Sequence, residues 1–274
     1  MSESVTNAST TASRVRIEHV SKTFEVQADR RQEQQTIVAL DDVSLDIADG
    51  EIVALTGLSG CGKTTLLRII MGLETASSGT VYANGKEVTG CGYDRGLVFQ
   101  QAQLLPWRNA LQNVEFGLEV QGVPEQERHQ RARAMLRLVG LEDSAGRRPD
   151  QLSGGMQQRV GLARALSIDP AVLLMDEPFA ALDAQTREGL QMEVLRIQAE
   201  THKTVVFVTH DLDEAILIAD RVVLMYPKPG RIGRIFDVDL PKPRADFGTI
   251  RGLPAFAELR YELWRSLMDS GERL

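Results

Sequence analysis

Apolar and polar residues alternate in the first part of the chain. The alternation over 15–20 and again over 43–47 is typical of half-buried strands. Residues 26–36, between these runs, are polar and charged and are expected to form a loop. Asn84-Gly85 separates two further short strand-like runs, which is a hairpin signal. The early part of the chain is therefore predicted to contain antiparallel strands.

A different order of elements begins at residue 51. The apolar run 51–56 leads into a glycine-rich loop and then a helix-like run over 65–73, the opening unit of an α/β nucleotide domain. Helical spacing replaces strand-like runs between about 109 and 166. Strands are expected again over 171–175, 204–208, 221–226 and 232–238. Near the end, one face of a predicted amphipathic helix carries Phe256, Leu259, Leu263 and Leu267.

These patterns predict an α/β fold whose core is a P-loop nucleotide domain with an antiparallel β subdomain. We expect three parts along the chain. Residues 1–14 form a disordered tail, and 15–240 form the nucleotide domain with a helical subdomain at about 102–168. Residues 241–274 form a C-terminal extension that contains the amphipathic helix.

The composition is that of a globular protein. The chain has 274 residues, 43% hydrophobic and 25% charged, and can bury a core without disulfides. Its two cysteines exclude a disulfide-rich secreted scaffold. Apolar runs fall far short of the roughly 20 residues of a membrane helix, and the first residues lack a signal-peptide pattern. We therefore expect a cytoplasmic protein. The net charge of −7 argues against a general polyanion-binding surface, so we expect no nucleic-acid partner.

Residues 57–64 read Gly-Leu-Ser-Gly-Cys-Gly-Lys-Thr and match the P-loop pattern. The loop follows a strand and opens a helix, so that backbone N–H groups can close around phosphate oxygens. Lys63 is expected to reach the β- and γ-phosphates, and the Thr64 hydroxyl to hold Mg²⁺. A chance match occurs in roughly one chain in a hundred. The predicted ATP-binding residues here are Gly57, Leu58, Ser59, Gly60, Cys61, Gly62, Lys63, Thr64 and Thr65.

Two carboxylates end the apolar run at 172–177. Asp176 fits the Mg²⁺-side aspartate of P-loop enzymes, and Glu177 is placed to orient and deprotonate a water molecule. The alternative for Glu177 is a helix cap. A second candidate phosphate site is Ser153-Gly154-Gly155, which precedes an amphipathic run, although such a helix start is often a plain cap.

With these motifs in order, residues 15–238 resemble the nucleotide-binding subunit of an ATP-binding cassette (ABC) transporter. Phe24 matches the aromatic residue that stacks on adenine in this family, Gln100 its Q-loop glutamine, and His210 its switch histidine. Considered alone, these three residues fit a core aromatic, a surface amide and a strand-end histidine. The resemblance implies the ABC ATPase fold and assigns catalysis to Glu177, His210 and Gln100, and Mg²⁺ to Thr64, Gln100 and Asp176.

The resemblance also implies that two copies of the chain sandwich ATP. Ser153, Gly154 and Gly155 would then bind ATP held by the opposite subunit, and Leu182-Asp183 matches the D-loop of the family. Two departures bear on the geometry of this contact. Leu58 replaces a common P-loop proline, and Ala180-Ala181 replaces a serine-containing start of the D-loop. Neither removes a phosphate ligand.

Segments 101–109, 227–232 and 239–244 resemble the nitrate, sulfonate and taurine importer branch. This implies an ATPase that lies peripherally at the cytoplasmic face of the inner membrane and drives a separate membrane permease, supplied by a periplasmic or lipid-anchored solute-binding protein. Trp107 would contact the permease; the alternative is core packing. The rival function is a soluble cassette ATPase in DNA repair or translation. Such proteins carry a long coiled-coil insertion or two cassettes, whereas Ser153 follows Lys63 by only 90 residues.

Cys61 is the one thiol within the P-loop. Its position beside Lys63 and at the start of a helix predicts a reactive thiolate that a maleimide modifies unless Mg-ATP is bound. The alternative is an inert cysteine buried beneath the loop.

Overall fold

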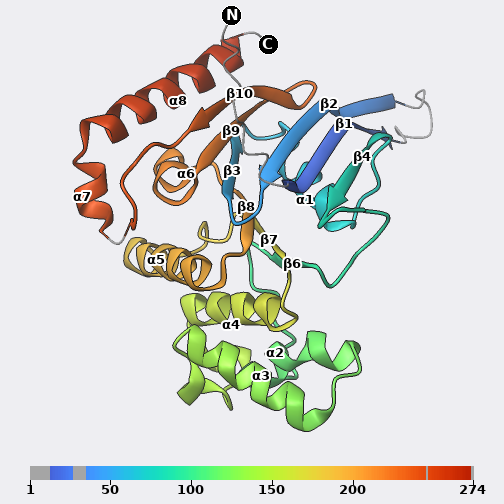
Figure 1. Ribbon diagram of the computed structural model, residues 1–274, viewed down its shortest axis with the longest axis vertical. Helices are drawn as coiled ribbons and strands as arrows, with labels where there is room; N and C mark the ends of the chain where they lie inside the picture. The colour runs from blue at the N-terminus through green and yellow to red at the C-terminus, as the bar shows by residue number, and fades with distance from the viewer. Residues whose placement is uncertain (1–12, 27–34, 245, 273–274) are drawn as a thin grey trace, which may run out of the picture.

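The computed structural model describes residues 13–26, 35–244 and 246–272 (Figure 1). One of its two sheets is antiparallel and has the strand order β2-β1-β4-β5. Its strands are β1 (Ser13–Val26), β2 (Gln35–Ala48), β4 (Ser78–Ala83) and β5 (Lys86–Glu87). The β4–β5 turn is the hairpin predicted at Asn84-Gly85.

Strands β1 and β2 are longer than the sequence pattern predicted. The expected tail at 1–14 lies mostly outside the described residues, but Ser13 and Arg14 belong to β1. The expected loop at 26–36 is also too long, because pairing between the two strands continues to Val26 and Gln35. Backbone hydrogen bonds hold such a ribbon together whether or not its side chains are polar. A polar stretch therefore does not by itself end a strand.

The second sheet is mostly parallel and has the order β10-β9-β3-β8-β7-β6. Its strands are β3 (Ile52–Gly57), β6 (Arg95–Val98), β7 (Val172–Asp176), β8 (Thr204–Val208), β9 (Arg221–Tyr226) and β10 (Arg231–Asp237). Only β10 pairs antiparallel, with β9. All residues of β3 and β8 are buried, as expected for strands covered on both faces. Because β8 pairs parallel with both β3 and β7, the carboxyl ends of these three strands meet at one edge of the sheet.

The helices form three groups. Helix α1 (Lys63–Met71) packs between the sheets, in a core cluster that contains Leu66, Leu67 and Ile70. A helical layer lies at one end of the molecule (Figure 1). It consists of α2 (Ala110–Val120), α3 (Glu125–Leu138) and α4 (Gly154–Ser167), with short 3₁₀ turns at Glu142–Ser144 and Pro149–Gln151. The remaining helices are α5 (Ala184–Thr201), α6 (Leu212–Ile218), α7 (Phe247–Arg251) and α8 (Pro254–Glu272).

The predicted C-terminal extension packs on the same core as the central sheet. Phe247, Phe256 and Leu263 are buried in the cluster that also contains residues of β7, β8 and α6. Arg244 is buried before α7 and donates to the carbonyl oxygens of Leu217 and Val238, 3.4 and 3.2 Å away. These contacts join the end of α6 to the segment after β10.

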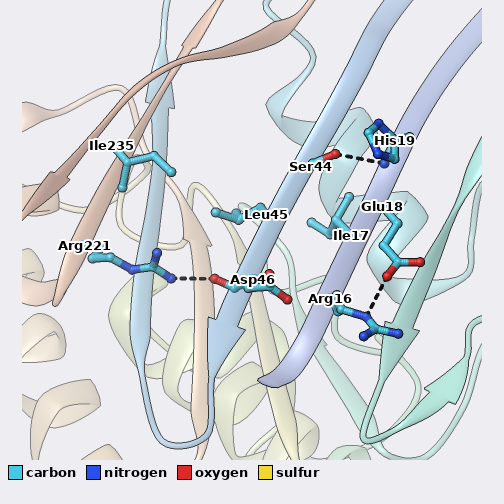
Figure 2. A pocket seen from close by; sticks show the side chains of 9 residues that line it. All are labelled: Arg16, Ile17, Glu18, His19, Ser44, Leu45, Asp46, Arg221 and Ile235. Carbon is cyan, nitrogen blue, oxygen red and sulfur yellow. Dashed lines mark hydrogen bonds and ion pairs between the residues drawn. The ribbon is translucent and has the colours of Figure 1, made fainter. Parts of the chain in front are cut away.

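A groove of about 640 Å³ runs between the antiparallel sheet and β9–β10 (Figure 2). Arg221 crosses it and donates to the backbone oxygen of Asp46 at 2.6 Å, while Arg16 pairs with Glu18 at 3.0 Å. Arg221 thus connects the two sheets, whereas the pair of Arg16 and Glu18 lies within β1. Among the described residues, no helix combines the length and apolar character needed to span a bilayer.

Candidate functional site

The P-loop closes tightly between β3 and α1 because its glycines adopt backbone angles that other residues avoid. Gly57 and Gly62 have φ angles of +147° and +88°. A Cβ on Gly57 would lie 2.3 Å from the carbonyl oxygen of Met225, and one on Gly62 would lie 2.5 Å from Cδ2 of Leu40. Between them, Ser59 and Gly60 are exposed at the tip of the loop. The loop therefore has the tight, exposed backbone that a phosphate-binding nest requires.

Lys63 is the first residue of α1 and only 8% exposed. Its Nζ donates to the carbonyl oxygens of Gly57 and Leu58 at 2.8 and 3.2 Å. The ammonium group is thus held across the loop, whose backbone begins a helix at this point. Thr65, also predicted to bind ATP, is half-buried in the first turn of α1. Positive charge and a helix N-terminus coincide here, which favours an anion.

Cys61 does not have the reactivity that its sequence position suggested. Its side chain is completely buried and belongs to the core cluster around α1. Burial raises the pKa of the thiol, although the nearby Lys63 ammonium, whose Nζ lies 3.6 Å from Sγ, opposes this shift. The predicted reactive thiolate is therefore wrong, because desolvation of the thiolate outweighs the neighbouring positive charge. The other cysteine, Cys91, is the exposed thiol.

Two side chains predicted to hold Mg²⁺ are in contact beside the P-loop. The Thr64 hydroxyl donates to Oδ1 of Asp176, the last residue of β7, at 3.0 Å. Burial raises the pKa of Asp176, while the hydrogen bond from Thr64 lowers it. Hydroxyl and carboxylate oxygens suit Mg²⁺, so the pair of Thr64 and Asp176 fits the ion. The amide of Gln100, also predicted to hold Mg²⁺, contacts Glu177 in this structure. Among the described residues, no cluster of three or more His, Cys, Asp or Glu could hold a metal ion from protein ligands alone. Mg²⁺ is commonly bound by one or two protein side chains together with phosphate oxygens and water.

Glu177 meets both of the other predicted catalytic residues. Its Oε2 lies 3.4 Å from Nε2 of Gln100, which donates to it, and its Oε1 lies 3.5 Å from Nδ1 of His210. Its backbone has φ +46° and donates from N–H to the oxygen of Val208 at 3.0 Å, so β8 fixes its position. The tertiary structure thus brings together three side chains that follow three different strands.

The motif at Ser153 is separate from this cluster. Ser153 caps α4, and its hydroxyl accepts a hydrogen bond from N–H of Met156 at 3.3 Å. A Cβ on Gly155 would lie 2.3 Å from Thr186 in α5, so the helix start packs closely against that helix. Within the described ranges, no hydrogen bond or ion pair links 153–155 to residues 57–65. Figure 1 shows α4 in the helical layer, away from α1.

Phe24 and Trp107 are both exposed, which rules out the core interpretation of each. The Phe24 residue is 37% exposed in β1, with Nζ of Lys22 4.8 Å from the ring centroid. Trp107 is 68% exposed just before α2. Asp183 of the predicted D-loop caps α5 by accepting from N–H of Thr186 at 3.1 Å. The ligands expected for Phe24 and Trp107 remain predictions.

A polar cluster beside Glu177 was not predicted from the sequence. It encloses a small cavity with Arg187, Thr209 and Glu214 among its lining residues. Glu214 lies in the first turn of α6, where an acidic residue is ordinary because it favours the helix dipole. Arg187 lies in the first turn of α5 with no motif around it. No signal in the sequence distinguishes these residues from solvated helix ends.

The chain is similar to several known proteins. The family model described as ABC transporter matches residues 40–180. An uncharacterized ABC transporter ATP-binding protein of Methanocaldococcus jannaschii is 51% identical over 231 residues, 84% of each chain. The taurine import ATP-binding protein TauB of Rhizobium johnstonii is 45% identical over 263 residues, covering 95% of this chain and 98% of TauB. A solved dimeric ATP-binding cassette bound to ADP and Pi is 36% identical with a TM-score of 0.71, over 82% of this chain and 98% of that one.

Proposed function

Because this chain belongs to the ABC transporter family and is an ATPase of that family, we propose that it energises uptake of a small solute through a separate membrane permease. The observation that carries the proposal is the convergence of Gln100 and His210 on Glu177, next to the contact between Thr64 and Asp176. A nucleotide whose phosphates lie in the P-loop would place its terminal phosphate near this group. The predicted α/β fold with its antiparallel subdomain is confirmed.

In this function each side chain has a distinct task. Lys63 and the N–H groups of the P-loop bind the phosphates, and Phe24 stacks on the adenine ring. Thr64, Asp176 and Gln100 would hold Mg²⁺, which would neutralise the charge that develops on the transferred phosphoryl group. Glu177 orients the attacking water and accepts its proton. His210 lies beside the Glu177 carboxylate and holds it in position relative to the terminal phosphate.

The site needs a second copy of the chain. Ser153, Gly154 and Gly155 present a capped helix start that, among the described residues, makes no hydrogen bond or ion pair with the P-loop of the same copy. A helix N-terminus is a favourable place for phosphate, so the start of α4 in an opposing copy can bind the phosphates of ATP held by the first copy. The dimeric cassette with 36% identity supports this arrangement. The chain then closes around two nucleotides as a homodimer.

The transport role is supported by the relatives and by one exposed side chain. A taurine import ATP-binding protein matches 95% of the chain, which favours a sulfonate, taurine or nitrate-like solute. Trp107 is 68% exposed beside the helical layer, where it can meet a permease. The chain would lie at the cytoplasmic face of the inner membrane, with a solute-binding protein acting through the permease.

Glu177→Gln tests the enzymatic part of this proposal. ATP hydrolysis by the purified full chain should fall at least about 100-fold, because a general base contributes this much or more. Mg-ATP should still bind, and the variant should accumulate as a dimer, measured by light scattering on a sizing column. Glu87→Gln, at an exposed position in β5, is the matched control and should leave both properties unchanged. Near-normal turnover of Glu177→Gln would contradict the assignment of the base.

The solute is tested by growth. Cells that lack this chain should fail to use one of taurine, an alkanesulfonate or nitrate as sole sulfur or nitrogen source, and the wild-type chain should restore growth where Glu177→Gln does not. Unimpaired growth on all three would contradict the solute class while leaving the ATPase assignment intact.

A further inference from the structure

A polar cluster lies beside the proposed catalytic glutamate, and two of its members, Thr209 and Glu214, are buried. It surrounds a cavity of about 50 Å³, and its members come from the segment after β7, the start of α5 and the segment after β8. The residues that line it are Glu177, Ala180, Arg187, Thr209, His210, Asp211 and Glu214. Two of them, Glu177 and His210, belong to the proposed catalytic site. The others have no role in the chemistry described so far.

Glu214 is the buried acid at the centre of this cluster. Its Oε2 accepts a hydrogen bond from the Thr209 hydroxyl at 2.6 Å, and its Oε1 accepts one from Nε2 of Gln191 at 3.0 Å. Both partners are almost completely buried. Burial raises the pKa of Glu214, and the hydrogen bond from Thr209 opposes that shift. Burying a carboxyl group costs free energy unless hydrogen-bond donors satisfy its oxygens, and here Thr209 and Gln191 supply those donors.

Arg187 connects Glu214 to the loop that follows Glu177. Its Nη2 donates to the carbonyl oxygen of Leu182 at 2.9 Å, within the predicted D-loop. Its Nε lies 3.8 Å from Oε1 of Glu214 and is buried without a hydrogen-bond partner. One guanidinium group therefore spans the distance between the loop and the buried acid. A small shift of the loop toward Glu214 would complete a hydrogen bond that is now too long.

Thr209 joins Glu214 to the backbone on both sides of His210. Its N–H donates to the carbonyl oxygen of Leu55 in β3 at 3.1 Å, and its hydroxyl accepts from N–H of Asp211 at 3.0 Å while donating to Glu214. Thr209 and Asp211 flank His210 on both sides. Holding both neighbours fixes the backbone from which the His210 side chain reaches Glu177. His210 is itself largely exposed, so this backbone is what positions it.

We propose that Glu214 and Arg187 are positioning residues that link the loop at 180–183 to His210, so that the loop and the catalytic pair Glu177–His210 adopt matched positions. The link runs from the carbonyl of Leu182 through Arg187, Glu214 and Thr209 to the backbone of His210. Neither residue touches the reacting atoms. This inference rests on the proposed roles of Glu177 and His210.

The test is a set of variants of the full chain, assayed for kcat and KM for ATP by single-turnover and steady-state hydrolysis. Glu214→Gln keeps the shape of the side chain but removes its charge and one acceptor. It should lower kcat by about 10-fold or more with less than a twofold change in KM, because misplacing a reacting group by about 1 Å costs up to about 100-fold in rate. In a His210→Ala background the same substitution should cost less than about twofold, since the two residues act in one chain of contacts.

Arg187→Lys supplies a second, independent readout. A lysine keeps a positive charge near Glu214 but has one nitrogen in place of the guanidinium fork, whose Nη2 donates to Leu182 while its Nε lies 3.8 Å from the acid, so kcat should fall several-fold. The kcat of the double variant Arg187→Met with Glu214→Gln should be no lower than that of the slower of the two corresponding single variants. The matched control is Glu115→Gln in α2, which removes another buried acid, paired with His129 at 2.9 Å. It should leave kcat unchanged.

The outcomes separate this inference from the function on which it rests. If His210→Ala and Glu177→Gln are slow but Glu214→Gln has normal kcat, or if its loss is equally large without His210, the linkage is overturned and the proposed function stands. If His210→Ala alone leaves kcat unchanged, the role of His210 is overturned and the linkage with it. A fall in melting temperature without a selective effect on kcat would show that Glu214 serves stability only, and would also overturn the inference.

Discussion

The hydroxyl of Thr64 donates a hydrogen bond to Oδ1 of Asp176 over 3.0 Å, across 112 positions of sequence. The contact joins the first turn of α1 to the end of β7, two elements that pack on each other around a shared core. Two oxygen ligands are therefore brought together by the packing of the nucleotide domain itself. A cation that binds here meets a pair that needs little rearrangement.

Thr64→Val should weaken the use of Mg²⁺ while leaving the fold intact, because valine has nearly the shape of threonine but offers no oxygen. The Mg²⁺ concentration for half-maximal ATP hydrolysis should rise about 10-fold or more, a size typical for the loss of groups that organise a metal site. Binding of ATP in the presence of a chelator should change little. Thr80→Val in β4 is the matched control. An unchanged Mg²⁺ requirement would remove Thr64 from the proposed cation site.

Maleimide should label one thiol of the folded chain. Cys91 is exposed and Cys61 is completely buried with a raised pKa, so the reagent should reach Cys91 only. Intact-mass measurement should show one adduct on the native chain, none on a Cys91→Ser variant, and two after denaturation of the wild type. ATP hydrolysis should survive labelling. An adduct on folded Cys91→Ser would show that the P-loop opens far enough to expose Cys61.

Trp107→Ala should weaken association with the permease. The side chain is 68% exposed, and tryptophans in the middle of protein interfaces commonly contribute about 2 kcal/mol or more to binding. Co-purification with the membrane subunits should fall strongly while KM for ATP stays the same. Trp264→Ala is the matched control, since Trp264 is 50% exposed on α8, away from the helical layer in Figure 1. Equal losses for both variants would contradict a permease surface at Trp107.

The pair of Arg14 and Asp49 should make stability depend on pH. Hydrogen bonds from Arg14, at 2.8 and 2.6 Å, hold the pKa of Asp49 below its ordinary value near 4. A lowered pKa means that the ion pair stabilises the fold fully above this ordinary value and that the stabilisation is lost as pH falls through the lower pKa of the folded state. Because the pair is largely exposed, Arg14→Met should cost no more than about 1 kcal/mol at pH 7.

Urea unfolding at several pH values measures this effect. The difference between wild type and Arg14→Met should stay constant from pH 7 to pH 5 and shrink only below about pH 4, where the carboxylate begins to be protonated. Asp49→Asn should remove the same pH-dependent difference. A difference that persisted undiminished into acid would assign the loss to the neighbouring Asn84 contact of Arg14 and not to the ion pair.

Local patterns in the sequence were enough to predict most strands, the P-loop and the two carboxylates at the end of β7. The strand expected over 204–208 is β8 and that over 221–226 is β9, because runs of apolar, largely β-branched residues need no distant partner to be recognised. Gly57 and Gly62 adopt angles that glycine tolerates and other residues avoid, so their place in the motif is also local information. The lengths of β1 and β2 were underestimated because pairing between backbones ignores side-chain polarity.

Distant contacts decided the rest. The reactivity of Cys61 depends on desolvation by the core around α1, which no neighbour in sequence reveals. Gln100, Glu177 and His210 meet only because three parallel strands end at one edge of the sheet. In the sequence, Glu214 and Arg187 resemble ordinary helix ends; only the fold buries Glu214 and brings Nε of Arg187 to 3.8 Å from it. Burial changes the free energy of a charge by far more than its neighbours along the chain do, and burial is a property of the packed molecule.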